Sequence, residues 1–324
     1  MVIDNNSASL NAGAFVADMS NPQLVSGNTV NIEKKTTKIS GVSNKLANFV
    51  RLLNPSSYEK REAEARLIRT ESFIDCAKLL KQQFPFISNE RAVLEALGYR
   101  VTNDQASNIG KIFFDATRNF SADRINEADI SPESRDAIIE NSKNAYDEYA
   151  QKIWSKLLSN EIENPGSISK KAISILGEMD SNDARDFEHM CTYLLPDPDI
   201  SVLILHEDQK YTFNDGNFNY DLRNKFESFG LINTSTAHIV YVPPKEFVKI
   251  IFKEHKILNL INNSDEEKEL SFSPALTQYG KELASLCREI WGTAPDILEF
   301  TRQIASDQGF IPCEYDEKES NKNV

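Results

Sequence analysis

The segment 131–162 constrains the fold more than any other stretch, because its pattern predicts one long amphipathic helix. Ser131 is a good N-cap residue, and Pro132 fits the first turn. The apolar residues fall into two adjacent rows at helical spacing: Ala145, Tyr149, Ile153 and Leu157, and Tyr146, Ala150, Trp154 and Leu158. Two neighbouring rows make a wide buried face, so we expect several helices to pack on this one, with Trp154 in the core.

The segment ends at Asn-Pro-Gly, residues 164–166, and a second helix is expected to follow. A serine after the glycine can cap the new helix. Backbone N–H groups at a helix start can also hold an anion, and two lysines lie close by. The candidate anion-binding residues are Ser167, Ser169, Lys170 and Lys171. A simple corner between two helices is the alternative that we favour.

The whole chain suggests a helical part followed by an α+β part. Residues 1–42 are rich in Asn, Ser and Thr and predict a flexible N-terminal arm. Helical periodicity dominates 43–198, which predicts a helical bundle domain. In 199–313, short apolar runs with strand propensity alternate with helices, and 314–324 is a charged tail. We therefore expect a mostly α protein in which a helical bundle precedes a smaller α+β domain.

The order of elements in the α+β part is similar to a winged-helix unit. A predicted helix at 220–229 is followed by Gly-Leu-Ile, and another helix begins near Leu276. Between them, strands are expected at 237–242, 247–261 and 268–273. A closing helix at 295–309 and a last strand at 310–315 complete this winged-helix-like domain.

A winged helix that binds DNA needs a cationic recognition helix and a basic wing. The candidate nucleic-acid-binding residues are Arg223, Lys225, Lys249 and Lys253. The candidate helix is nearly balanced in charge, because Asp221 and Glu227 accompany its two basic residues. A solvated strand face is the simpler explanation for the lysines of the wing. Winged-helix units that bind proteins or dimerise fit an acidic chain better.

Composition argues against several classes of protein. The chain has 324 residues and a formal net charge of −13, which disfavours coating of nucleic acid or anionic membranes by bulk attraction. No apolar run approaches the roughly 20 residues that cross a bilayer. The N-terminus lacks the basic start and apolar region of a secretory signal. We therefore expect a cytoplasmic protein without a membrane-spanning segment.

Sequence motifs for catalysis, cofactors or metals are not found. The four cysteines and four histidines are not spaced as local zinc ligands. The chain lacks the phosphate-binding, dinucleotide-binding, GxSxG and HExxH patterns. We therefore predict no catalytic residues, no cofactor and no metal, and interpret the cysteines as free thiols in a reducing compartment. A site assembled from residues distant in the sequence stays open.

Part of the chain resembles a family of uncharacterised bacterial proteins, domain of unknown function 2806. The resemblance is carried by QKIWSKLLSNEIENPGSISKKAISILGEMDSNDARDF at 151–187, FESFGLI at 226–232, LTQYGKEL at 276–283 and EKREAEARLIRTES at 59–72. The resemblance implies a bacterial, cytosolic protein that is not in the membrane, and it implies no particular chemical activity. A looser similarity to abortive-infection proteins suggests an accessory role in phage defence.

Three functions compete, and we rank them in this order. The first is a non-enzymatic interaction or regulatory protein that binds a protein partner or forms a homo-oligomer. The second is a nucleic-acid-binding protein that uses the winged-helix-like unit. The third is an enzyme of unrecognised type. Acidity and the lack of catalytic motifs favour the first.

Overall fold

The computed structural model describes residues 49, 52, 60–120, 130–195, 202–205, 212–213, 216–217, 220–252 and 256–316. These residues belong to one compact unit, residues 41–324. The predicted arm at 1–42, residues 317–324 of the predicted tail and Lys253 lie outside the described residues. The division into a bundle at 43–198 and a domain at 199–313 therefore stays a prediction.

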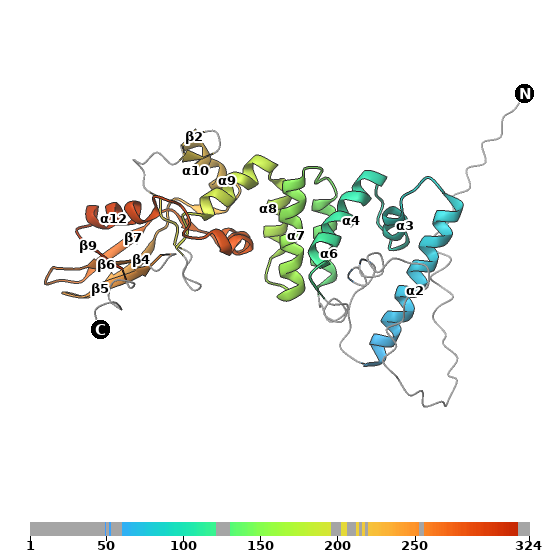
Figure 1. Cartoon of the computed structure of the whole chain (residues 1–324), viewed down its shortest axis with the longest axis horizontal. Coiled ribbons are helices and arrows are strands. Elements are labelled where there is room, and N and C mark those ends of the chain that lie inside the picture. The colour runs from blue at the N-terminus through green and yellow to red at the C-terminus, as the bar shows by residue number, and fades with distance from the viewer. Residues whose placement is uncertain are drawn as a thin grey trace, which may run out of the picture. The chain divides into compact units, whose positions relative to one another are not determined.

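The described part of the chain is mostly helical, and its strands follow the long run of helices (Figure 1), as expected. The helices are α2 (Lys60–Gln83), α3 (Asn89–Ala96), α4 (Asn103–Thr117), α6 (Pro132–Ser142), α7 (Glu148–Glu163), α8 (Lys170–Glu178), α9 (Ser181–Cys191), α10 (Tyr220–Ser228), α11 (Gln278–Ala284), the 3₁₀-helix η4 (Ser285–Ile290) and α12 (Ile297–Asp307). The strands are β1 (Thr212–Phe213), β2 (Gly216–Asn217), β3 (Ile232–Asn233), β4 (His238–Val242), β5 (Phe247–Ile251), β6 (Lys256–Ile261), β7 (Lys268–Phe272), β8 (Ala275–Leu276) and β9 (Ile311–Asp316).

The segment 131–162 forms α6 and most of α7, so the prediction of a single helix is wrong. Asp147 caps α7, because its carboxylate accepts hydrogen bonds from two backbone N–H groups of that helix at 2.9 and 3.2 Å. An aspartate that bonds nearby N–H groups starts a new helix instead of continuing the old one. The break leaves Tyr146 62% exposed, whereas Trp154 is 4% exposed in the core, as predicted.

The core of the helical part lies where α4 packs on α7 and α6 packs on α8 (Figure 1). Its buried side chains include Ile109, Ile112 and Phe113 of α4, Ile138 and Ile139 of α6, Trp154, Leu157 and Leu158 of α7, and Ile173 and Ile175 of α8. Burial of one such side chain stabilises the folded state by about 1.5–3 kcal/mol before entropy is counted. The apolar rows therefore position the corner between α7 and α8.

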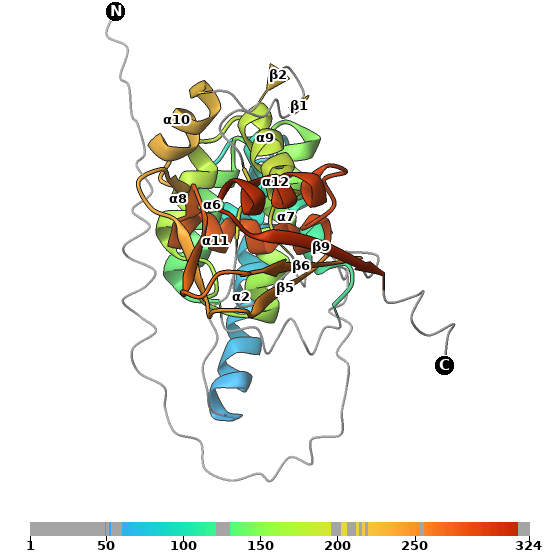
Figure 2. The same cartoon turned by 90° about the vertical axis from the view of Figure 1, so that its left-hand side faces the viewer.

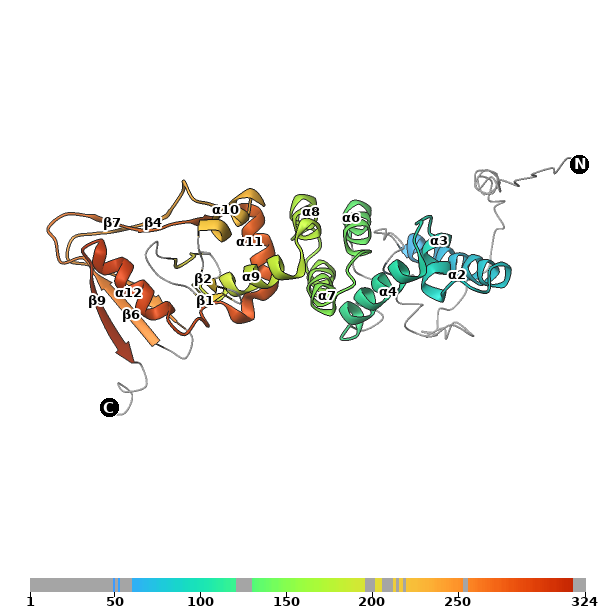
Figure 3. The same cartoon turned by 90° about the horizontal axis from the view of Figure 1, so that it is seen from above.

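The strands form a long antiparallel ribbon (Figure 3). β3 pairs with β8, β4 with β7 and β5 with β6, and these pairs are nested. The run 247–261 is therefore two strands, β5 and β6, and the single strand expected there is wrong, because the chain reverses within it. The predicted last strand is confirmed as β9, which pairs with the other side of β6. Figure 2 shows α12 beside β6 and β9.

Asn262 fixes the place where β4 passes into β5 and β6 passes into β7. Its side chain is fully buried. The amide Nδ2 donates to the carbonyl oxygens of Val242, Pro243 and Glu266 at 2.9, 3.0 and 2.8 Å, and Oδ1 accepts from the backbone N–H of Ser264 at 3.0 Å. One buried amide thus satisfies the backbone groups that the interrupted ladder leaves unpaired.

Gly280 brings α11 into contact with the backbone at Leu231. A Cβ atom at position 280 would lie 2.0 Å from the carbonyl oxygen of Leu231. Thr277 fixes this approach, because its N–H donates to the same oxygen at 3.0 Å and its Oγ1 accepts from the N–H of Gly280 at 3.1 Å.

We expect Gly280→Ala to lower the free energy of unfolding by about 2–3 kcal/mol, because α11 must move away from Leu231. Urea denaturation measures the loss. The control is Lys281→Ala at the exposed next position, which we expect to stay within about 0.5 kcal/mol of the unmodified chain. Equal stability of the two variants would contradict the close approach.

Candidate functional site

A buried carboxylate occupies the corner between α7 and α8. Glu161 has no exposed surface. Its Oε1 accepts hydrogen bonds from the N–H of Ile168 at 2.8 Å and the Oγ of Ser167 at 3.1 Å, and its Oε2 accepts from the N–H of Gly166 at 3.1 Å. Two of the backbone N–H groups that lie just before α8 are therefore already bonded by a carboxylate of the chain itself.

The start of α8 is also bonded to the C-terminal part. The Oγ of Ser169 caps the helix by accepting from the N–H of Ala172 at 3.2 Å. The N–H of Ser169 donates to Oε2 of Glu282 on α11 at 2.8 Å. Lys170 and Lys171 are exposed. The four predicted anion-binding residues lie together, but two carboxylates hold the N–H groups of the corner, and anion binding there stays a prediction.

The candidate recognition helix α10 contacts α9. Lys225 forms an ion pair with the buried Asp183, and its hydrogen bond to Asp183 is the main reason why the pKa of Lys225 is raised. One residue on, Phe226 is fully buried, and its ring meets that of Phe187 edge to face at 5.9 Å. Lys225 and Phe226 of this helix are therefore both engaged in contacts within the chain.

The other candidate nucleic-acid residues lie on α10, on the ribbon or outside the described residues. Arg223 is on α10 and half-buried, and the charge of Arg223 helps to lower the pKa of Glu227, after hydrogen bonds from Thr234. Lys249 is on β5 and exposed. Lys253 lies outside the described residues. Nucleic-acid binding by this set stays a prediction.

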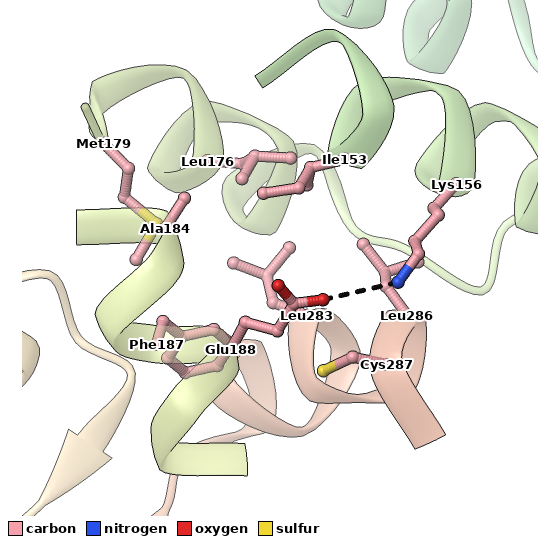
Figure 4. A pocket seen from close by; sticks show the side chains of 10 residues that line it. All are labelled: Ile153, Lys156, Leu176, Met179, Ala184, Phe187, Glu188, Leu283, Leu286 and Cys287. Atoms are coloured by element: carbon pink, nitrogen blue, oxygen red, sulfur yellow. Dashed lines mark hydrogen bonds and ion pairs between the residues drawn. The ribbon is translucent and has the colours of Figure 1, made fainter. Parts of the chain in front are cut away.

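A second cluster of polar side chains joins α7, α9 and η4 (Figure 4). Lys156 on α7 bonds Glu188 on α9 at 3.4 Å and Glu289 on η4 at 2.7 Å. Tyr149 donates a hydrogen bond to the other oxygen of Glu188. The cluster borders a cavity of about 30 Å³ that is lined mainly by apolar side chains, among them Phe187 and Leu283. This volume has room for ordered water and is far below that of a metabolite pocket.

The protonation states of this cluster are unsuited to nucleophilic catalysis. Burial favours the neutral amine of Lys156, but its hydrogen bond to Glu289 and the charges of Glu289 and Glu188 outweigh burial and raise the pKa of Lys156. Burial and the hydrogen bond to Glu188 raise the pKa of Tyr149. Burial, followed by a hydrogen bond with Cys287, raises the pKa of Cys191. At neutral pH these groups are a charged lysine, a neutral phenol and a neutral thiol, none of which is an activated nucleophile.

We expect Tyr149→Phe to lower the free energy of unfolding by about 1–2 kcal/mol at neutral pH, because Glu188 loses a donor. The folded-state pKa of Tyr149 is raised above its ordinary value of 10.0. The contribution of its neutral form is therefore complete below pH 10.0 and is lost as pH rises through the folded-state value. Urea denaturation of both chains at several pH values measures this. A difference that disappears well below pH 10.0 would contradict the geometry.

The ribbon carries exposed apolar side chains on two of its strands, β4 and β5. Ile239 and Tyr241 on β4 are 43% and 58% exposed, and Phe247 and Ile251 on β5 are 57% and 55% exposed. These residues alternate along β4 and along β5, so they share a face within each strand. We call these four side chains the ribbon patch. The sequence did not predict the ribbon patch, because the pattern of a strand does not show which of its two faces is exposed to water.

Comparison with known proteins identifies the family. Residues 98–292 match the family described as a protein of unknown function, DUF2806. The chain belongs to the DUF2806 family. No curated protein and no solved structure matches it significantly. The match covers the Glu161 corner, the contact between α9 and α10 and the ribbon, whereas the helix at 59–72, expected to share the pattern, lies outside it.

The described residues of this DUF2806 protein show neither a metal site nor a membrane span. Groups of three or more His, Cys, Asp or Glu side chains that could hold a metal ion are absent from them. Each described helix is too short or too polar to cross a bilayer.

Proposed function

We propose that this DUF2806 protein is a non-enzymatic interaction protein that binds a protein surface through its ribbon patch. The observation that carries the proposal is the exposure of four large apolar side chains along β4 and β5. Exposed large apolar side chains that share one face of a strand, as Ile239 and Tyr241 do on β4, are typical of protein-binding sites. A strand that lies at the edge of a sheet can also accept a further strand.

The polar clusters support this proposal over an enzyme. In the corner, Glu161 has its carboxylate bonded by the neighbouring backbone. In the α7–α9–η4 cluster, both oxygens of Glu188 are bonded by Tyr149 and Lys156, and the adjacent cavity is water-sized. Each of these groups already has partners that hold the helices together, and a substrate would have to displace them.

Nucleic-acid binding is the second candidate, and the order of elements favours it. Helix α10, strand β3, the ribbon, strand β8 and helix α11 follow one another as in a winged helix, and we propose this classification for 220–284. Lys249 is exposed on the wing-like part of the ribbon. Against this candidate, Lys225 is engaged by the buried Asp183, which a phosphate would have to replace. A bacterial, cytosolic setting and an accessory role in phage defence are also part of the proposal, and they rest on the resemblance alone.

Affinity capture of the tagged chain from its native cells tests the proposal, with protein and nucleic acid both measured in the eluate. We expect a protein complex free of nucleic acid that survives nuclease and is lost in the variant with lysines at Ile239 and Tyr241. Lys249→Glu with Lys253→Glu is the matched control, because it changes two charges close in the sequence to Ile251 and keeps the apolar side chains of the patch. Nucleic acid that co-purifies and is lost in this control would establish the second candidate instead.

A further inference from the structure

The two long sides of the ribbon differ in what covers them. On the β6–β7 side, β9 pairs with β6. Gln308, at the end of α12, takes the place of a strand beside β7: its Oε1 accepts from the N–H of Ser271, and its Nε2 donates to the carbonyl oxygen of Ser271, both at 2.7 Å. On the β4–β5 side, no strand among the described residues pairs with β4 or β5 other than β7 and β6.

The bonds of Gln308 also show which backbone groups of β4 point outward. Ser271 is paired with Ile239. Because Ser271 uses its N–H and its carbonyl on Gln308, the two residues form a non-hydrogen-bonded pair of the antiparallel ladder. The N–H and carbonyl of Ile239 therefore point away from β7. Outward groups recur at every second residue, so those of Tyr241 point the same way.

The outward edge of β4 carries no formal charge. Its sequence is His-Ile-Val-Tyr-Val, and the residues with outward backbone groups, Ile239 and Tyr241, also have the exposed side chains. Natural edge strands are often protected by a lysine, as β5 is by Lys249. The whole chain carries a formal charge of −13, so two copies repel each other at most surfaces. An uncharged edge is where that repulsion is weakest.

We propose that β4 is covered by β4 of a second copy of this chain, antiparallel and centred on Val240. This inference rests on the proposed function and names the partner. In this register Ile239 of each copy faces Tyr241 of the other, and each such pair exchanges its outward N–H···O bonds. A branched aliphatic residue opposite an aromatic one is a favourable cross-strand pair. His238 faces Val242, so no like charges meet.

Pro243 excludes one of the two neighbouring registers, and the other, centred on Ile239, would set Tyr241 opposite Ala237, which lies outside β4. Pairing centred on Tyr241 would place Ile239 opposite Pro243, which has no N–H to donate. The same self-pairing of β5 about Lys249 would set two lysines opposite each other, which is destabilising. In the arrangement centred on Val240, every outward N–H and carbonyl group of β4 is therefore hydrogen-bonded, and no two charged residues lie opposite each other. It is two-fold symmetric, as interfaces between identical chains usually are.

Paired substitutions test the register, and sedimentation velocity on the full chain measures whether each variant is a dimer. Protein concentrations run from about 1 to about 100 μM, because an interface of small area is expected to bind weakly. Ile239→Lys with Tyr241→Lys sets lysines against lysines, and we expect monomers. Ile239→Lys with Tyr241→Glu removes the same apolar residues but sets lysine against glutamate, and we expect the dimer to return. Phe247→Lys with Ile251→Lys is the matched control on β5, and we expect it to dimerise like the unmodified chain.

A cross-link gives an independent readout that does not depend on added charges. Cys76 and Cys313 are the exposed free cysteines of the described residues, and both are first replaced by serine. Val240→Cys should then give a disulfide-linked dimer on mild oxidation with oxidised glutathione, because the two Cα atoms of a non-hydrogen-bonded pair are about 4.5 Å apart. The proposal is overturned by a monomeric unmodified chain, by loss of the dimer in the β5 control, by equal behaviour of the two β4 variants, or by an absent cross-link. A monomer that still captures another protein would overturn this inference and keep the proposed function.

Discussion

Glu161→Ala is expected to lower the free energy of unfolding by about 3–4 kcal/mol. The substitution removes the acceptor of two backbone N–H groups and a hydroxyl at the corner between α7 and α8. The N–H of Ile168 is buried, so it would be left without a partner and without water. Equilibrium denaturation in urea, followed by circular dichroism, measures the loss.

Two further variants show whether the carboxylate is the cause. Glu161→Gln keeps one acceptor oxygen but turns an NH₂ group toward a backbone N–H, and we expect about half of the loss. Glu163→Ala removes an exposed carboxylate from the same helix, and we expect a change within about 0.5 kcal/mol. If Glu161→Ala were as mild as Glu163→Ala, the corner would not depend on its buried carboxylate.

Asn262→Asp is expected to destabilise the protein by about 4 kcal/mol at neutral pH. The change is nearly isosteric, but it replaces the NH₂ group that donates to the carbonyls of Val242, Pro243 and Glu266 by an oxygen. A buried carboxylate facing carbonyl oxygens has neither water nor donors to stabilise its charge. Thermal and urea denaturation measure the effect.

Asn263→Asp provides a matched control for this substitution. It makes the same chemical change at the next residue, which is exposed. We expect its stability to stay within about 0.5 kcal/mol of the unmodified chain. Similar losses at the two positions would mean that added charge, and not the buried amide, causes the effect.

Features that depend on local periodicity were predictable from the sequence. The buried Trp154, the serine cap of α8 and the final strand β9 follow from residue spacing and capping preferences. The break before α7 was not predicted, because the apolar row of Ala145, Tyr149, Ile153 and Leu157 runs across it, whereas the carboxylate of Asp147 caps a new helix there. An aspartate that can cap a helix, placed inside a continuous amphipathic pattern, is the signal in the sequence that could have predicted this break.

Features that depend on contacts between distant residues were not predictable. The bond from Ser169 to Glu282 and the bonds of Gln308 to Ser271 join residues that no spacing relates. Glu161 is an intermediate case. It occupies the next place in the row of Leu157, and a carboxylate on a buried row signals a partner within the protein. The outward edge of β4 could be assigned only once the pairing of Ser271 was known.

Light scattering with absorbance detection on the chain purified from its native cells tests the central claim most directly. We expect a particle heavier than one chain, with the absorbance ratio of pure protein, that returns to the mass of one chain when lysines replace Ile239 and Tyr241. A particle with the mass of one chain at every concentration, or one whose excess mass is nucleic acid, would contradict it.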